Sequence, residues 1–513
     1  MKGTAEKRRN ILNICLILGS ALLFLFFVYI NLIQYKYGLN ADVASEGMLA
    51  KVMWDSKEWI PEEWYSSTET RVLSPANIAS LFYGITKDIC LAMGLASIVG
   101  MIFVLLGARS LGQELELNKT QQLLFLFLIL LLPNNKNIIE LMYLFAGYYA
   151  PHIALYFFAM SCYLKLLKRQ NIKWYTFFFL WLCSFLLGMQ GVRIILIATG
   201  PMFATEMVRM LHLFWRKNPW SKNESKVSVY VLSLNIAAFL GGRLPMSVGY
   251  PLSRNIRKAP QKFFAVVFPD FLNCFEWKNV SVVEQVTFVG ILLVIIGIVI
   301  GIIGKGIQKK EICGKEWTLV NFCLSVCLTM AALTFTTVDS SSRYFIVIYY
   351  AMALVIAMAW DRSNHLCKGI ILFIMAVFIV GNSARVYYPM MVDKNYENSD
   401  YVKVGEYLIA EHYENGYTNF DHANTFTVAN DGMIQVSAVS SLSNMEICKW
   451  LTSKKWYVPH VPMESKTAYI VTDYRMDEFD SFLKEHADTI EFKTKIGEFN
   501  IYGSDYNYSK LTD

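Results

Sequence analysis

Long apolar stretches separated by short polar connections dominate the first 383 residues. The first stretch runs from Ile11 to Leu32, and others follow at about 89–107, 121–133, 150–167, 173–189, 192–208, 227–242, 284–304, 317–337, 344–360 and 367–383. About 20 apolar residues are needed to cross a bilayer as a helix, so this pattern predicts an α-helical polytopic membrane protein with about eleven transmembrane helices. The first stretch exceeds the roughly 7–15 apolar residues of a signal peptide, and we expect it to remain as a transmembrane helix.

The pattern changes after Ser383, where the chain becomes polar and shows short alternating runs such as "TAYIVTD" and "EFNIYG". Alternation with period two is typical of strands, and helical periodicity occurs near 400–413 and 475–487. The sequence therefore predicts two domains: a transmembrane domain at 1–383 and a C-terminal soluble α/β domain at 384–513.

Composition agrees with a membrane protein, since 55% of the residues are hydrophobic and only 17% are charged. A net charge of +6 is small for this length and indicates no nucleic-acid partner. The ten cysteines show no CxxC or Cys/His metal spacing, and most lie in apolar runs. We interpret them as small core residues.

Lysine and arginine placement predicts the orientation, because short cytoplasmic loops retain positive charge. With the N-terminus in the cytoplasm, the inner segments carry 21 of the 47 Lys and Arg residues. An odd number of spans then places the C-terminal domain outside a plasma membrane.

The loop between the first two spans, residues 35–87, is long, acidic and aromatic. Within it, Asp42 and Glu46 stand four residues apart and would share one face of a helix. Two such carboxylates can accept protons, bind a divalent cation or face water. Further on, "WYSSTETRVLSP" places Trp64, Tyr65, Glu69 and Arg71 in the same loop.

This arrangement resembles the GT-C superfamily, integral-membrane glycosyltransferases that use polyprenyl-phosphate sugars and include protein O-mannosyltransferases and lipid A aminoarabinose transferases. The resemblance covers the whole architecture, but at motif level it rests on "ADVASEG", "WYSSTETRVLSP" and "SSSRY". It extends to a group of bacterial multi-span membrane proteins with a similar first loop. Many relatives have adjacent Asp-Glu, whereas here Val43 follows Asp42, which leaves two candidates for the catalytic base.

The resemblance implies inverting transfer of a sugar from a polyprenyl-phosphate donor to an envelope acceptor at the outer membrane face. One carboxylate must then relieve the acceptor hydroxyl of its proton. We expect Asp42 to be this base, with Glu46 or Glu69 orienting it or sharing a metal. Asp42 and Glu46 are the candidate ligands of a divalent cation, Mg²⁺ or Mn²⁺; no other cofactor is indicated.

Several side chains are candidates for substrate binding. Arg343, followed by Tyr344 in "SSSRY", resembles the late-loop arginine that contacts the lipid-linked phosphate in relatives; its alternative role is a membrane-interface anchor. Arg71 could meet the phosphate, or pair with Glu69 if both lie on one face of a strand. Trp64 and Tyr65 would line the same substrate side.

Positive charge also gathers between 243 and 283, where an outer loop should be poor in it. Arg243, Arg254 and Arg257 could bind a lipid phosphate or an anionic acceptor, or contact anionic head groups of membrane lipids. His152 and Arg193 lie at or inside predicted spans, where ionisable groups usually face a polar cavity, and either could line the substrate cavity. The alternative for His152, which follows Pro151 near a helix start, is a buried, hydrogen-bonded histidine.

Two other functions stay open at this stage. A transporter or lipid flippase would use the same spans as a substrate path, although the sequence shows no repeat relating two halves. A non-catalytic envelope scaffold would leave the acids of the first loop and the arginines without a shared purpose. The sequence does not identify the sugar, the acceptor or the oligomeric state.

Overall fold

A computed structural model describes residues 2–34, 39–144, 147–217, 221–244, 253–254, 256–362, 365–392 and 399–510. The chain forms two compact units, which we name by their content. The helical unit contains residues 1–27 and 99–389, and the mixed unit contains residues 28–98 and 390–513. The second unit therefore joins the first loop to the C-terminal domain, two segments that are far apart in the sequence.

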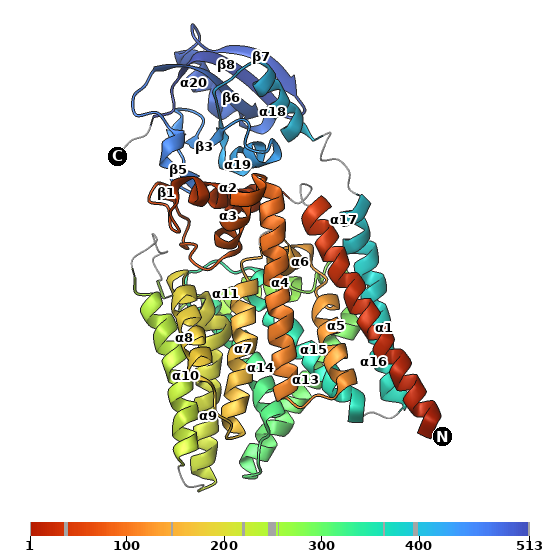
Figure 1. Cartoon of the computed structure of the whole chain (residues 1–513). Helices are drawn as coiled ribbons and strands as arrows, with labels where there is room; N and C mark the ends of the chain where they lie inside the picture. The colour runs from red at the N-terminus through yellow and green to blue at the C-terminus, as the bar shows by residue number, and fades with distance from the viewer. Residues whose placement is uncertain are drawn as a thin grey trace. The chain divides into compact units, whose positions relative to one another are not determined.

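Helices make up almost all of the helical unit (Figure 1). Their bounds are α1 Lys2–Tyr29, α4 Ile89–Glu114, α5 Lys119–Leu131, α6 Lys136–Tyr143, α7 Ala150–Leu167, α8 Trp174–Met189, η3 Ile195–Thr199, α9 Gly200–Trp215, α10 Lys222–Gly241, α11 Ala259–Lys262, η4 Phe263–Val267, α12 Phe268–Asn273, α13 Val282–Ile307, α14 Gly314–Phe335, η5 Ser342–Phe345, α15 Val347–Arg362, α16 His365–Asn382, η6 Ser383–Tyr387 and α17 Tyr388–Val392. Helices α1, α4 and α17 extend across the boundary into the mixed unit.

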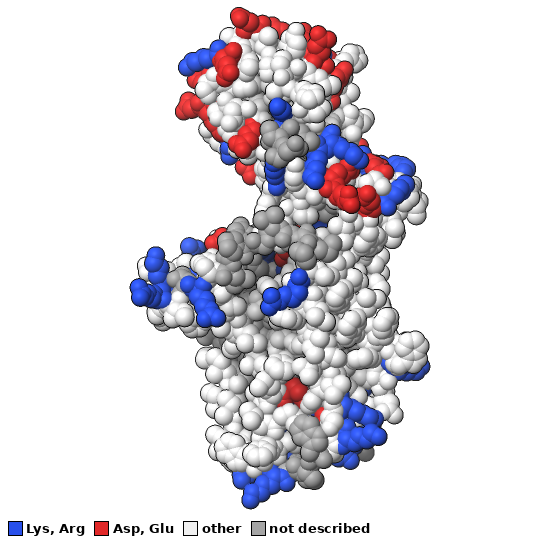
Figure 2. Space-filling model, turned by 90° about the vertical axis from the view of Figure 1, so that its left-hand side faces the viewer, with Lys and Arg blue, Asp and Glu red and all other residues white. Residues whose placement is uncertain are grey.

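Seven helices within the described residues are long and apolar enough to cross a membrane, or eight if one bent pair counts as a span. That pair, α5 and α6, is bent by 117°. Three expected spans are absent from this set. Helix α8 has only 16 residues, the run at 192–208 contains the π-helical segment η3, and α10, at the run 227–242, is long enough but not sufficiently apolar. Figure 2 shows the membrane-type surface: a broad band with few charged side chains separates two regions of the helical unit where Lys and Arg gather.

Two glycines allow α8 and α10 to touch backbone to backbone. A Cβ atom on Gly188 would lie 2.2 Å from the Ala238 carbonyl oxygen, and one on Gly241 would lie 2.1 Å from that of Phe185. Close approach at small residues is the usual way in which helices associate in lipid, where burial of apolar surface gives no advantage.

The mixed unit contains a six-stranded sheet with the order β4-β3-β2-β6-β8-β7. Strand β2 pairs in parallel with β3 and β6, and the other pairs are antiparallel. The bounds of the C-terminal elements are α18 Asp400–Ala410, β2 Asn415–Asn419, α19 Phe420–Ala429, β3 Val436–Ser441, β4 Glu446–Ile447, β5 Thr452–Ser453, η7 Lys454–Trp456, β6 Met463–Thr472, η8 Asp473–Arg475, α20 Met476–Glu485, β7 Glu491–Ile496 and β8 Phe499–Asn507. The expected polytopic helical protein with a C-terminal α/β domain is confirmed.

The first loop contributes α2 Ala41–Ser56, β1 Trp64–Tyr65 and α3 Pro75–Thr86 to the mixed unit. Strand β1 pairs antiparallel with β5, with Trp64 opposite Ser453 and Tyr65 opposite Thr452. Helix α2 packs against α19, and the amide of Asn424 donates to the Ser45 hydroxyl over 2.8 Å. The segment that carries the candidate base is thus part of the folded C-terminal domain.

Candidate functional site

Asp42 occupies the first turn of α2. Asn40 caps this helix, since its side-chain oxygen accepts a 3.0 Å hydrogen bond from the backbone N–H of Val43. The partial positive charge at a helix N-terminus favours the ionised carboxylate there. Asp42 is exposed, and its side chain has no hydrogen bond or ion pair with another described residue. It is therefore available to a substrate.

Glu46, one turn further along α2, is engaged by Arg71. The Arg71 Nε atom lies 2.6 Å from Glu46 Oε1, and its Nη1 atom lies 2.6 Å from Glu69 Oε2. Only 6% of the Glu46 side chain is exposed. One guanidinium therefore holds two carboxylates of the first loop.

This ion-pair group has a consequence for two sequence predictions. Arg71 pairs with Glu69, which was one of the two roles expected for it. The strand expected for this pair is wrong, because residues 66–74 form an irregular loop. Asn77, at the start of α3, fixes this loop by donating to the carbonyls of Trp59 and Arg71 over 3.3 Å. A phosphate role for Arg71 stays a prediction.

Trp64 and Tyr65 pack against the C-terminal domain. The Trp64 ring meets the Trp456 ring edge to face at 5.7 Å, and the Lys454 ammonium lies 5.5 Å from the centre of the Tyr65 ring. The structure gives both aromatics a packing role at the β1–β5 pair, and their expected contact with substrate stays a prediction.

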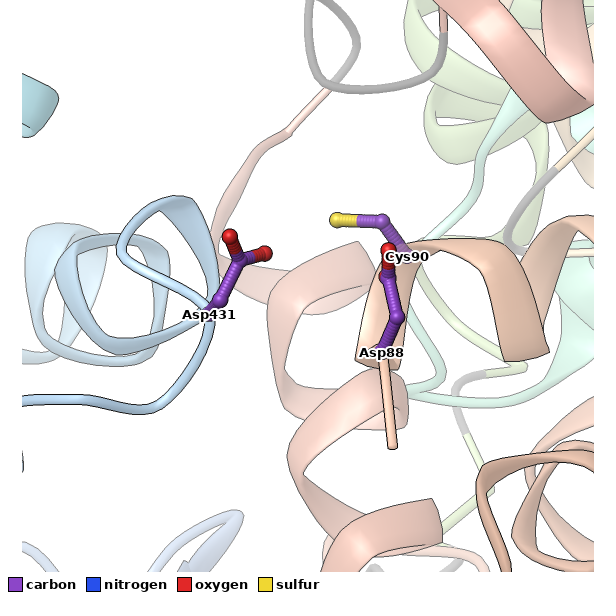
Figure 3. A group of neighbouring side chains, drawn as sticks. All are labelled: Asp88, Cys90 and Asp431. Carbon is purple, nitrogen blue, oxygen red and sulfur yellow. The ribbon is translucent and has the colours of Figure 1, made fainter. Parts of the chain in front are cut away.

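One group of three potential metal ligands lies close together among the described residues (Figure 3). Its members are Asp88 and Cys90, at the start of α4, and Asp431, in the turn after α19; their ligand atoms lie within 4.8 Å of one another. Asp88 also caps α4, because its Oδ1 atom accepts from the Leu91 N–H over 2.8 Å. Asp42 and Glu46 do not belong to this group, so the expected divalent cation at these two residues stays a prediction.

The helical unit brings two arginines onto one cluster of tyrosines. Arg343 donates through Nη1 to the Tyr148 hydroxyl over 3.2 Å and lies 5.6 Å from the centre of the Tyr344 ring. Arg193 lies 5.1 Å from the ring centre of Tyr148 and 4.6 Å from that of Tyr149. Both guanidinium groups are half-buried. Two cations held over aromatic faces can receive an anion such as a phosphate.

His152 belongs to the same neighbourhood. It is 1% exposed, its Nδ1 atom lies 3.0 Å from the Tyr148 carbonyl oxygen, and its ring lies 6.4 Å from that of Tyr149. Sequence reasoning singled out Arg343, Tyr344, His152 and Arg193 separately. It missed Tyr148 and Tyr149, although the pair of adjacent tyrosines at the predicted start of a span was a usable signal.

The basic stretch after Gly242 contributes less to a defined site. Arg243, Arg254 and Arg257 are exposed, and none of them forms an ion pair with a residue that the structure describes. Residues 245–252 and 255 of this stretch lie outside the described residues. Lys262, in contrast, donates to the carbonyls of Thr336 and Val338 over 2.8 and 2.6 Å and joins α11 to the end of α14.

These features define a class of fold: a bundle of membrane-length helices joined to a mixed α/β unit, with an exposed carboxylate in the first loop and a cationic aromatic cluster in the helical unit. The structure is similar to that of ArnT from Cupriavidus metallidurans in the apo state, with a TM-score of 0.57, 12% sequence identity and coverage of 95% of this chain and 97% of that one. The form of ArnT bound to undecaprenyl phosphate matches with a TM-score of 0.52, 10% identity and coverage of 96% and 97%.

A third similar structure is the oligosaccharyltransferase from Archaeoglobus fulgidus in the apo form. Its TM-score is 0.50 at 12% identity, and the match covers 83% of this chain but only 64% of the archaeal protein. No protein-family model and no curated protein sequence matches the chain. The expected GT-C resemblance is thus confirmed at the level of the fold.

Proposed function

We propose that this protein transfers a sugar from a polyprenyl-phosphate donor to an acceptor hydroxyl. The observation that carries the proposal is the pairing of a GT-C fold over 95% of the chain with two arginines gathered on one tyrosine cluster. The ArnT structure with undecaprenyl phosphate supports the class of donor, because the same fold there holds a polyprenyl phosphate.

Asp42 is the general base in this reaction. The acceptor oxygen attacks the anomeric carbon, the bond from that carbon to the phosphate oxygen breaks, and the polyprenyl phosphate leaves with the electron pair. Asp42 takes the hydroxyl proton. A single displacement from the face opposite the phosphate inverts the configuration at the anomeric carbon. Glu46 is not a base of comparable reach, since it is buried and already paired with Arg71.

Arg343 and Arg193 bind the donor phosphate and stabilise the charge that it gains on leaving. A guanidinium can donate two parallel hydrogen bonds to phosphate oxygens, and the tyrosine rings hold both guanidinium planes. The exposed Arg243, Arg254 and Arg257 contribute more diffuse attraction to an anionic lipid.

The proposed location is a plasma membrane, with the N-terminus in the cytoplasm and the C-terminal domain outside. The bias of Lys and Arg toward the predicted inner loops supports this orientation. A lipid-linked donor agrees with it, because it places the activated sugar at the membrane surface.

Donor turnover tests the proposal. Protein in lipid nanodiscs is incubated with a panel of polyprenyl-phosphate sugars and cell-envelope extract, and released polyprenyl phosphate is measured for wild type, Asp42→Asn and Arg343→Gln. We expect turnover of one donor by wild type. Asp42→Asn should lose about 100-fold or more, the usual scale for removing a general base, and Arg343→Gln should lose about as much, because it removes a fixed donor to the departing phosphate.

Two variants serve as matched controls: Glu62→Gln, an exposed acid of the same loop, and Arg109→Gln, an exposed arginine of α4. Both should keep wild-type turnover. If no donor is consumed, or if Asp42→Asn retains full turnover, the proposed reaction or the proposed base is wrong. In the first case, where no donor is consumed, a transporter or a scaffold would account better for the spans.

A further inference from the structure

A small polar pocket of about 220 Å³ lies within the mixed unit, away from the residues to which we assign the chemistry. Three separate segments form it: the second half of α2, Glu63 of the first loop, and the C-terminal domain. Its lining residues are Met48, Lys51, Val52, Asp55, Ser56, Glu63, Gln435, Ser453, Lys455 and Trp456. The pocket therefore exists only because the first loop is folded onto the C-terminal domain.

The charged groups of the pocket balance one another. Lys51 binds Asp55 over 2.6 Å, and Lys455 pairs with Glu63. The Glu63 carboxylate raises the pKa of Lys455, so this lysine stays cationic. With two cations and two anions, the lining favours neither a phosphate nor a metal ion. It offers both hydrogen-bond donors and hydrogen-bond acceptors, which suit a neutral ligand that carries several hydroxyl groups.

Trp456 adds an aromatic surface to this polar lining. Its ring is half-buried and is held by the perpendicular ring of Trp64, at an interplanar angle of 87°. An aromatic face carries partial negative charge and attracts polarised C–H groups. The combination of one tryptophan with carboxylate and amide groups suits a pyranose ring, which has C–H groups on its faces and hydroxyls on its rim.

We propose that this pocket binds one neutral sugar unit of the acceptor. The size supports a single small unit, since pockets for drug-sized ligands have about 300–1,000 Å³. Lys51 follows Asp42 by nine residues on the same helix, which corresponds to about 14 Å at 1.5 Å per residue. A subsite at this distance would hold a unit of the acceptor other than the one that carries the reacting hydroxyl. This acceptor role, but not sugar binding itself, rests on the proposed function.

Binding is tested on the full chain in nanodiscs without any donor. Methyl glycosides of glucose, galactose and mannose and N-acetylglucosamine are titrated by saturation-transfer NMR and by tryptophan fluorescence. We expect at least one to bind, and Trp456→Ala and Asp55→Asn to weaken binding by about tenfold. Trp450→Ala is the matched control, because Trp450 is a tryptophan of the same domain that is 37% exposed and does not line the pocket.

Asp55→Asn changes an exposed side chain and keeps the proposal testable if the tryptophan variant does not fold. If none of the sugars binds at concentrations up to about 50 mM, the proposed sugar site is wrong. Such a Kd would be far weaker than 1 mM, which corresponds to a binding free energy of −4.1 kcal/mol. Sugar binding that ignores both substitutions would also overturn the proposed site. If the pocket binds sugar but no donor is turned over, the pocket stands and the proposed function fails; if transfer occurs and the pocket variants leave the acceptor KM unchanged, the acceptor role fails.

Discussion

At the residue scale, the carboxylates of Asp42 and Glu46, which lie four residues apart on α2, have different environments. The sequence placed Asp42 and Glu46 on one helix face, and either could have been the base. In the structure Asp42 is exposed in the first turn of α2, whereas Glu46 is buried against Arg71. A long-range partner decides between them, because residue 71 reaches residue 46 only after the loop has folded. Spacing along one helix could not supply this information.

The substitution Arg71→Met should lower the stability of the mixed unit. It would leave Glu46 and Glu69 without their shared cation, and an uncompensated buried charge costs about 3–5 kcal/mol. We expect a clearly lower apparent Tm of the protein in nanodiscs. Asp42→Asn should leave the Tm almost unchanged, since exposed substitutions usually stay within about 0.5 kcal/mol.

Glu46→Gln combined with Arg71→Met serves as the control for this prediction. The double variant removes the buried carboxylate together with its partner and should recover part of the lost stability. An Arg71→Met protein with wild-type Tm would show that the ion pairs contribute little, and Arg71 would then be a better candidate for phosphate binding.

At the element scale, the length of the apolar runs predicted where helices occur better than it predicted whether each helix is straight and long enough to span a membrane. The runs at 89–107, 150–167 and 284–304 correspond to α4, α7 and α13, each long enough to span. The run at 121–133 ends in a sharp bend, and that at 192–208 is interrupted by a π-helical segment, because packing inside the bundle decides such breaks. Helix α19 escaped sequence analysis, since its residues "FDHANTFTVA" are nearly all buried and show no amphipathic period.

Contacts between helices give a prediction at the same scale. Gly241→Ala places a methyl group 2.1 Å from the Phe185 carbonyl oxygen, so α8 and α10 must separate. Overpacking of this kind costs about 1–3 kcal/mol, and we expect a lower Tm in nanodiscs. Gly290→Ala on α13 is the matched control, because its new Cβ would meet no described atom within 4 Å. Equal Tm values for the two variants would contradict the close backbone contact.

At the scale of the whole molecule, the chain folds the first loop together with its C-terminal segment. The sequence predicted a helical domain and a separate soluble domain, and in the latter it located two strands, β6 and β8, and two helices, α18 and α20. It could not show that residues 28–98 belong to the same compact unit, since this depends on the pairing of β1 with β5 and of α2 with α19. These pairings consist of two-residue strands and of packing between helices that are far apart in the sequence, and neither leaves a periodic pattern.

Substitution of Asn424 tests whether the C-terminal domain holds the first loop in place. The Asn424 amide donates to the Ser45 hydroxyl over 2.8 Å and to the Leu451 carbonyl over 3.0 Å, and it connects positions 379 residues apart. Asn424→Ala leaves these buried acceptors without their donor, at a cost of about 1–3 kcal/mol. We expect amide hydrogen exchange across α2 to accelerate by about tenfold or more, and donor turnover to fall because the helix that carries Asp42 is less firmly held.

Asn444→Ala, at an exposed position of the same domain, should change neither quantity. Exchange in α13, which belongs to the helical unit, should also stay constant. Faster exchange in α2 with unchanged turnover would mean that the C-terminal domain stabilises the first loop without positioning the base.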